Sequence, residues 1–369
     1  MYFDTLPTEI ITHIFLSLPT VDSALSLAST CHHFHHVYHS SKRLLILTSA
    51  AEIEFGPLDD IIQVVTHNAS QPAHIHRNVP ISDALIKQIV TIGRVAQKYE
   101  AIYPFKKWKT EDSSSRRLLT PAERHNFRRA LYRLWLFSRA FHNASHARYA
   151  RSLPETMRER ALLLHNFPTR ELCEMLDAHL ILRDIVANNV CPSNGRIRRK
   201  FHKRHPESSH QLLFNIHLNY PPITSFVMPD HHHYNSPTFL ASASKYHAKL
   251  TPSRFHEPGA EGWGDDVGHY YVVEDMMKLD PGQILLLKER FPLKSQVEAY
   301  VAALGEWFGN NGETFSETLA FVVAQRGRMC RRLRRRSGKG GWGLLGWKRG
   351  VRAGLLVGVW FVRCALRLS

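Results

Sequence analysis

The chain has 369 residues, of which 44% are hydrophobic and 22% charged, as in an ordinary globular protein with a sizeable core. Its formal net charge is +16, but thirteen Lys and Arg and no acidic residue fall within residues 326–369, which leaves +3 for residues 1–325. The basic character belongs to a tail, which excludes any argument from the whole-chain charge to nucleic-acid binding.

The five cysteines are odd in number and widely spaced, and no Cys-x-x-Cys pair occurs. This pattern argues against a disulfide framework and favours a reducing compartment. Residues 1–7 hold no basic segment followed by an apolar run, so we expect no secretory signal. The expected location is the cytoplasm or the nucleus.

Periodic apolar residues predict a mostly α-helical chain. Pro7 suits the first position of a helix that ends before Pro19, and Thr20 suits the cap of a second helix whose apolar stripe runs to Phe34. The clearest helix start is the segment 120–123, Thr-Pro-Ala-Glu, which combines a capping box with an N-terminal proline. Further helices are expected after Ser82, after Thr169, near residues 293–308 and over residues 314–333.

Strand signals are scarce. Residues 212–218 and 269–273 could form short strands, and the pattern leaves both ambiguous. Residues 106–117 and 220–264 have loop composition, and the second segment is long for a structureless loop in a compact domain.

Charged and aromatic residues outside the N-terminal segment are given mainly structural roles. The acidic residues at 265, 266, 274 and 275 are expected on a solvated face rather than in a catalytic pair. Tyr132 and Trp135 are expected in the core, whereas Trp263 fits either the core or a surface contact. The helix after Thr120 should carry its arginines mostly on the face opposite its apolar stripe: Arg124, Arg128, Arg129, Arg133 and Arg139.

The N-terminal segment carries the one motif that points to a function. Residues 6–19 begin with Leu-Pro-x-Glu, and residues 24–34 continue with apolar residues that end on Cys31 and Phe34. Together these two segments resemble the F-box family over about forty residues. Where that family often has a basic pair before the final aromatic residue, this chain has His32 and His33, which are mostly neutral at pH 7.

The resemblance implies a small helical bundle that docks on a Skp-family linker subunit, which joins a cullin scaffold. Forty residues bury too little apolar surface to be stable alone, and this segment is apolar on more than one side, which suits a domain covered by a partner. The protein would then be a non-catalytic, substrate-recruiting adaptor of a cullin-type (SCF) ubiquitin ligase that acts on an unknown protein substrate. The expected partner-binding residues are Leu6, Pro7, Glu9, Ile10, Ile14, Phe15, Leu18, Leu25, Cys31 and Phe34.

Patterning alone also allows a structural reading, in which these helices are the first hairpin of an ordinary helical core. Two downstream segments, 129–135 and 262–275, look like segments of F-box proteins from filamentous fungi.

Signals for a metal or a cofactor are weak, and neither is expected. The three adjacent histidines at 231–233 point in different directions, and no His-Glu-x-x-His occurs. Cys191, His202 and His205 could supply three ligands but lack a paired cysteine. No glycine-rich phosphate loop or Gly-x-Ser-x-Gly segment is present.

The expected fold is mostly α: an N-terminal F-box over residues 1–47, an irregular α-helical module for substrate recognition over 48–325, and a basic, flexible, disordered tail over 326–369. The tail supports an alternative function, the binding of nucleic acid or an anionic membrane surface. Its apolar run, 353–362, is too short to span a membrane.

Overall fold

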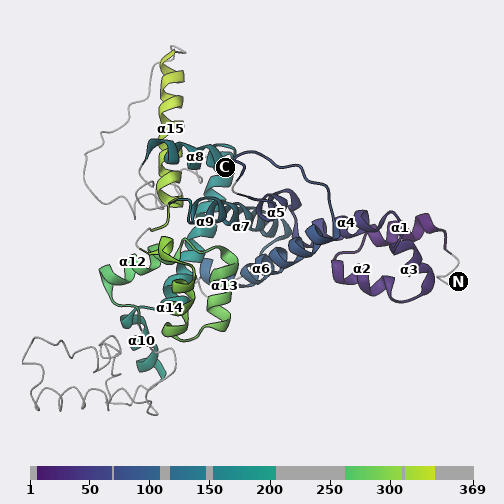
Figure 1. The fold of residues 1–369 in the computed structure, drawn as a ribbon, viewed down its shortest axis with the longest axis horizontal. Coiled ribbons are helices and arrows are strands. Elements are labelled where there is room, and N and C mark those ends of the chain that lie inside the picture. The colour runs from purple at the N-terminus through teal and green to yellow at the C-terminus, as the bar shows by residue number, and fades with distance from the viewer. Residues whose placement is uncertain are drawn as a thin grey trace, which may run out of the picture. The chain divides into compact units, whose positions relative to one another are not determined.

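The computed structural model describes residues 6–68, 70–108, 117–146, 153–204, 262–309 and 312–336 (Figure 1). These residues form helices and contain no strand, so the prediction of a mostly α fold is confirmed. Residues 269–273, which the sequence left ambiguous, are helical. Residues 212–218, the three histidines at 231–233 and most of the basic tail lie outside the described residues.

The chain divides into two compact units. Unit 1 contains residues up to Leu182, the short segment Lys278–Gly282 and the residues from Glu313 onward; unit 2 contains Arg183–Met277 and Gln283–Gly312. Helices of unit 1 are α1 (Thr8–Leu16), α2 (Val21–Ala28), α3 (His32–Tyr38), α4 (Arg43–Phe55), α5 (Leu58–Val65), α6 (Asp83–Lys107), α7 (Pro121–Phe141), α8 (Pro154–His165), most of α9 (Thr169–Ile185) and α15 (Phe315–Arg336). Unit 2 holds the π-helical turn η4 (Val186–Val190), α10 (Asn194–Arg204), α12 (Asp266–Met276), most of α13 (Pro281–Arg290), α14 (Lys294–Ala303) and the 3₁₀ turn η6 (Glu306–Phe308).

The helix caps expected from the sequence are present. The Ser23 amide donates to Thr20 Oγ1 at 3.0 Å, and the Leu85 amide donates to Ser82 Oγ at 3.2 Å. At the start of α7 the Glu123 amide donates to Thr120 Oγ1 at 3.3 Å, and the Glu123 carboxylate accepts from the Thr120 amide at 2.8 Å, which completes the capping box.

Two N-terminal boundaries differ from the prediction. Pro7 was expected at the first helical position but occupies the N-cap position, so α1 begins one residue later, at Thr8. The helix expected to run from Thr20 to Phe34 is two helices, because the chain turns after Ala28 and α3 begins at His32. Cys31 caps α3, since its Sγ accepts a hydrogen bond from the Phe34 amide at 3.4 Å.

Unit 1 has a continuous apolar core built around α4, α5, α6 and α7. Helix α4 packs against α6, α5 packs against α6 and α7, and α15 packs against α8. Tyr132 and Trp135 on α7 are buried, as expected, and the Tyr132 hydroxyl donates to the Phe55 carbonyl at 2.9 Å. Gly93 on α6 lies directly against the buried Phe55 ring, so this glycine lets α4 and α6 approach closely.

Three of the α7 arginines that the sequence places opposite the apolar stripe are largely buried in ion pairs with neighbouring helices. Arg128 pairs with Glu100 of α6, and both side chains are only 11% exposed. Arg129 pairs with Glu174 at 2.5 Å, and Arg133 pairs with Asp60 at 2.9 Å. These arginines therefore cross-link α7 to α5, α6 and α9.

In unit 2, acidic residues expected to face solvent have partners within the unit. Asp265 Oδ1 accepts from the Gly195 amide at 3.0 Å, and Asp275 Oδ1 accepts from the Gly312 amide at 2.8 Å. Glu274 forms an ion pair with Arg183. The expected solvated face is confirmed for Asp265, which is exposed, and is wrong for Glu274, whose side chain is only 16% exposed; Asp275 is partly exposed.

Both expected domain boundaries fall inside helices. Residue 47 lies within α4, and α15 continues from Phe315 past Gln325 to Arg336. Among the described residues no helix is long and apolar enough to cross a membrane. No group of three His, Cys, Asp or Glu side chains arranged to hold a metal occurs in the described ranges, and the Cys191 thiol is buried, which raises its pKa.

Candidate functional site

The two apolar strips of α1 have different environments. Ile11 and Phe15, four residues apart, are fully buried. The neighbouring strip holds Ile10, which is 48% exposed, and Ile14, which is partly exposed. Since both strips are apolar, α1 uses one to form a core and leaves the other at the surface.

The buried strip closes a small aromatic core. The Phe15 and Phe34 rings meet edge to face with centroids 6.4 Å apart, and the Phe15 and Tyr38 centroids lie 6.0 Å apart. Phe15 and Phe34 were both expected to contact a partner. In the structure they hold α1 against α3, and their side chains are closed off from the surface.

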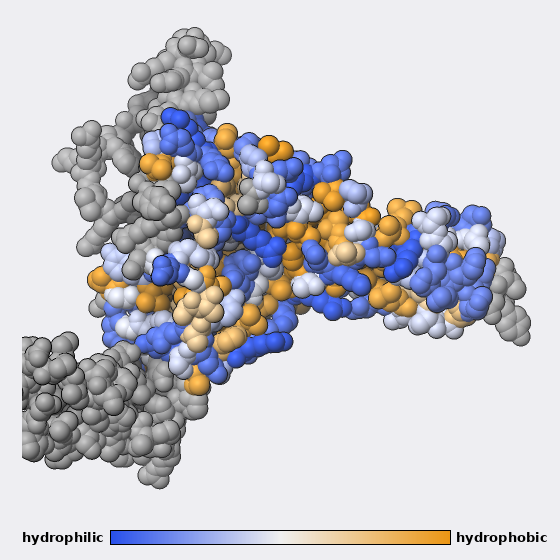
Figure 2. Space-filling view, in the orientation of Figure 1, coloured by the Kyte–Doolittle hydropathy of each residue, from blue (hydrophilic) through white to orange (hydrophobic). Residues whose placement is uncertain are grey.

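The remaining expected residues reach the surface to different degrees. Pro7, Glu9, Ile10 and Leu25 are exposed, and Leu25 on α2 is 46% accessible. A second group is partly exposed: Leu6, Ile14, Leu18 and Cys31. The surface of the N-terminal helices in Figure 2 is correspondingly mixed, with apolar residues interrupting hydrophilic ones. The structure therefore presents apolar side chains from both α1 and α2.

The sequence analysis missed the role of His33 in positioning the N-terminal segment. His33 Nε2 lies 3.3 Å from the Leu6 carbonyl oxygen, so its N–H tautomer holds the residue before Pro7 against α3. The sequence analysis treated His32 and His33 only as a weak basic pair. A polar side chain in the first turn of a helix can equally well secure a neighbouring segment, and this is the signal that was overlooked.

Helix α4 packs against α1 and α2 and holds both in position. Ser49 Oγ donates to the Leu16 carbonyl at 3.2 Å, at the end of α1. Glu54 Oε2 accepts from the Val21 amide at 2.8 Å, at the start of α2, where a carboxylate also complements the helix dipole. Because α4 also packs along α6, the N-terminal helices are joined to the core of unit 1 rather than to a loop.

Two histidines lie side by side at the C-terminal end of α3. The His35 and His39 rings lie 4.2 Å apart, and desolvation, followed by the charges of His35 and Arg43, lowers the pKa of His39.

Comparisons with known proteins agree with this geometry at the N-terminus. No curated protein and no solved structure matches the chain, so the similarity of segments 129–135 and 262–275 to fungal F-box proteins has no support beyond those residues. One protein family does match: the F-box domain, over residues 3–43. The helices α1, α2 and α3 thus lie within an F-box domain at the N-terminus of this chain.

Proposed function

We propose that the protein is a substrate-recruiting adaptor of a cullin-type ubiquitin ligase and that its F-box binds a Skp-family linker subunit. The observation that carries the proposal is the exposed apolar strip of α1, with Ile10 at its centre, on a domain that the F-box family matches. A half-exposed isoleucine and leucine on a small helical domain are the kind of anchors that a partner covers.

We propose a smaller contact set than the one expected from the sequence. Phe15 and Phe34 build the core and Cys31 caps α3, so these three shape the docking face without forming it. The contact residues we retain are Leu6, Pro7, Glu9, Ile10, Ile14, Leu18 and Leu25. Pro7 presents a rigid apolar ring, because its φ is fixed, and His33 holds its neighbour Leu6.

In this proposal the chain supplies proximity and the chemistry belongs to other subunits. The linker and cullin would hold the ubiquitin-loaded enzyme, and the helical body of this chain would hold the target. Bringing the two together raises the effective concentration of target lysines around the enzyme.

The test uses exposed residues, so that folding is not disturbed. Full-length chains carrying Ile10→Arg or Leu25→Arg are compared for capture of a purified Skp-family linker subunit. The controls are Ile53→Arg and Leu162→Arg, which lie outside the F-box match and are 52% and 46% exposed, close to the values of Ile10 and Leu25. Burying an unpaired guanidinium should weaken capture by at least about tenfold.

The controls should bind the linker as the unaltered chain does, and a Leu6→Ala/Pro7→Ala chain should bind more weakly. Equal capture of the linker by the unaltered chain and all five variants would contradict the proposed contact residues. If no chain, including the unaltered one, binds the linker while circular dichroism shows it folded, the adaptor proposal fails. The alternative based on the basic tail, salt-dependent binding of nucleic acid or anionic membranes, then takes its place.

A further inference from the structure

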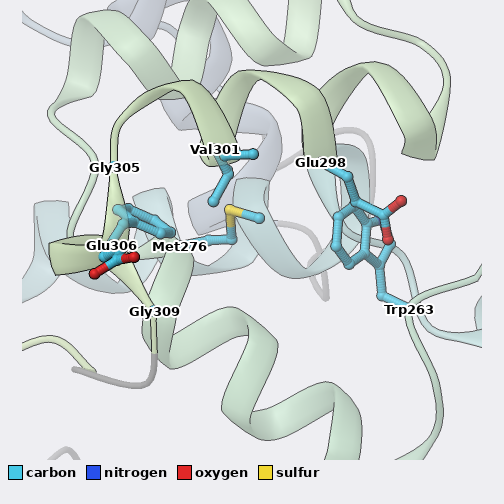
Figure 3. Close-up of a pocket in the computed structure, with 9 residues that line it drawn as sticks. Trp263, Met276, Glu298, Val301, Gly305, Glu306 and Gly309 are labelled. Carbon is cyan, nitrogen blue, oxygen red and sulfur yellow. The ribbon is translucent and has the colours of Figure 1, made fainter.

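Unit 2 contains an apolar pocket of about 390 Å³ that the F-box does not explain. Trp263 lies at one end beside Glu298, Met276 and Val301 lie in the middle, and Glu306 lies at the other end (Figure 3). The buried side chains of Met276 and Phe308 are part of the lining. Its volume falls within the roughly 300–1,000 Å³ range of ligand pockets, at the small end.

The walls of the pocket are held in place by contacts within unit 2. The Trp263 amide donates to the Pro192 carbonyl at 3.0 Å, and Lys294 Nζ lies 5.3 Å from the centre of the Trp263 ring. At the opposite end, Trp307 Nε1 donates to the Leu304 carbonyl at 2.5 Å, which secures the turn before η6. Gly305 makes this turn with φ of 98°, a conformation that side-chain-bearing residues rarely adopt.

The two carboxylates of the pocket differ in their environment. Glu298 forms an i,i+4 ion pair with Lys294 at 3.6 Å, so its charge is balanced. Glu306 is exposed at the start of η6, and its carboxylate has no ion pair with any residue that the structure describes. The pocket therefore combines an apolar floor with one uncompensated negative charge at the Glu306 end.

We infer that this pocket binds a peptide segment of a partner protein, with a bulky apolar side chain in the pocket and an Arg or Lys one or two residues away, paired with Glu306. This inference rests on the proposed adaptor function, because the bound segment would belong to the recruited substrate. Burial of the apolar side chain in the pocket supplies affinity, and the ion pair between the cation and Glu306 supplies selectivity.

A peptide suits this pocket better than an anionic metabolite. The pocket offers no arginine and no cluster of backbone N–H groups among its lining residues, and its lysine neighbour is already paired. Gly305 and Gly309 line the Glu306 end without side chains, which leaves room for an extended backbone to pass. The combination of an apolar pocket and a flanking charge is a common way of reading a short linear segment.

The experiment is selection of a phage-displayed random dodecapeptide library on the full-length chain, followed by fluorescence anisotropy on the enriched peptides. Ala302 is an exposed residue that lines the pocket, so Ala302→Phe should block the pocket with an aromatic ring. The matched control is Ala303→Phe, because Ala303 is also exposed but does not line the pocket. The charge is reversed by Glu306→Lys, with Glu289→Lys as its control on α13.

The expected peptides carry a bulky apolar residue with Arg or Lys within two positions. Their affinity should fall at least about tenfold with Ala302→Phe and severalfold with Glu306→Lys, and it should stay within about twofold with Ala303→Phe and Glu289→Lys. A peptide with Glu in place of its basic residue should bind Glu306→Lys better than it binds the unaltered chain.

Several outcomes would overturn the inference: no enriched peptide, enriched peptides without a basic residue, or equal binding by the Ala302→Phe chain. Linker capture measured on the same variants separates the two proposals. Pocket variants that no longer bind the peptide but still capture the linker subunit support both the peptide site and the adaptor role. A chain that binds peptides through the pocket and never binds the linker retains the peptide site and refutes the adaptor role.

Discussion

Gly93 shows how one missing side chain sets the spacing of two helices. A Cβ at this position would lie 2.3 Å from two carbon atoms of the Phe55 ring, and that ring is fully buried. The clash is with the rigid base of a packed ring rather than with the end of a flexible side chain. Gly93 is therefore required by the approach of α4 and α6, and not by its backbone conformation.

We expect Gly93→Ala to lower the free energy of unfolding by about 1–3 kcal/mol, because the overpacked Phe55 ring or α4 must shift. The control is Gly327→Ala in the interior of α15, where a Cβ meets no atom within 4 Å. This control should stabilise the protein by up to about 1 kcal/mol through helix propensity. Thermal unfolding followed by circular dichroism measures both, and equal melting temperatures for the two variants would contradict the close-approach argument.

His142 is the centre of a buried polar group in unit 1. Its Nε2 lies 3.0 Å from Thr314 Oγ1 and accepts from the Thr314 amide at 3.2 Å. Nε2 therefore carries no proton, and the imidazole is neutral. Desolvation lowers the pKa of His142 to about 3, and the charges of Glu313 and Lys278 alter this shift only in part. Burial alone would raise the pKa of Glu313, but the nearby His179 and hydrogen bonds from Ser316 lower it.

The depressed pKa of His142 predicts an acid-sensitive fold. The unfolded chain protonates this histidine below its ordinary pKa of 6.5, whereas the folded chain protonates it only near 3, so stability is lost as the pH falls between these values. At pH 5 the loss from this residue is about 2 kcal/mol. Melting temperatures between pH 5 and 7 should fall with acid in the unaltered chain and less steeply in His142→Gln.

The window above pH 5 is chosen because the pKa of the neighbouring Glu313 is lowered, so that this carboxylate stays ionised there. The control is His125→Gln, which changes an exposed histidine of the same helix. It should keep the full acid dependence. An equally steep dependence in His142→Gln would assign the acid sensitivity to other groups.

At the residue scale, the sequence predicted which positions are apolar but not which of them are buried. Ile10 and Ile11 are adjacent and chemically identical, yet one is half exposed and the other fully buried. The difference is set by α3 and α4, whose packing no local pattern specifies. For the same reason Phe15 and Phe34 were expected at the docking face and lie in the core, and the hydrogen bond from His33 to Leu6 was not foreseen.

Among the elements, α7 is joined to its neighbours by several polar cross-links. Arg133 contacts both Asp60 of α5, at 2.9 Å, and Glu171 of α9, at 2.5 Å. Arg128 pairs with Glu100 of α6 and also donates to the Glu54 carbonyl of α4 at 2.5 Å. Planar guanidinium groups suit this role, because each can bond to several acceptors at once. Helix α7 is thus bound to its neighbours by directed polar contacts as well as by its apolar stripe.

Removing one partner of the ion pair between Arg128 of α7 and Glu100 of α6 should lower the free energy of unfolding far more than removing both. We expect Arg128→Met to lower the free energy of unfolding by about 3–5 kcal/mol, because Glu100 is left buried without a cation. Arg128→Met/Glu100→Leu should recover much of that loss. Arg94→Met, which breaks an exposed pair with Asp22, should change stability by less than about 1 kcal/mol. Chemical denaturation measures all three, and similar losses for the two single variants would show that Arg128 is not effectively buried.

Element starts were predictable where the cap is local. Thr20, Ser82 and Thr120 act within three residues of themselves, and each caps its helix as expected. The break between α2 and α3 was not predicted, because the apolar stripe continues through it and a cysteine is an unusual cap. The ion pairs of the α7 arginines were not predicted either, since their acidic partners lie 28 to 73 residues away in the sequence.

On the scale of the whole molecule, unit 1 is assembled from three separate stretches of chain. The Tyr99 hydroxyl donates to the Pro281 carbonyl at 2.7 Å, and Arg139 pairs with Asp280 at 3.6 Å, so the short segment Lys278–Gly282 is anchored to α6 and α7. At the start of α15, the Phe315 ring lies 5.5 Å from that of Phe137 and 5.0 Å from that of His179. Cooperative regions should therefore follow the two units and not the order of the chain.

Phe315→Ala tests this arrangement. It removes a buried ring that joins α15 to α7 and α9, and we expect a loss of about 3–5 kcal/mol. Hydrogen–deuterium exchange should then accelerate in α7, α8 and α9 while α14 keeps its protection. The reciprocal variant, Val297→Ala at a buried position of α14, should accelerate exchange in unit 2 and spare unit 1. Uniform acceleration in either variant would mean that the two units unfold together.

The division into units could not be predicted from the sequence. The sequence analysis expected one module over residues 48–325, with a boundary at Gln325 that in fact lies in the middle of α15. Composition reveals a basic tail, but it does not reveal that the helix preceding the tail packs against α8, some 160 residues earlier. Such long-range pairing depends on the complementary shapes of distant segments, which no local periodicity records.

The contact between α15 and the end of α8 has a consequence for synthesis on the ribosome. Arg326 donates to the Phe167 carbonyl at 2.7 Å and to Thr169 Oγ1 at 3.1 Å. During synthesis these two acceptors therefore lack their donor until about 160 more residues have been translated. At roughly 5–20 residues per second, this interval lasts on the order of ten to thirty seconds. The contacts of α1, α2 and α3 with α4 all fall within the first 55 residues, so the F-box can form while the rest of the chain is still being made.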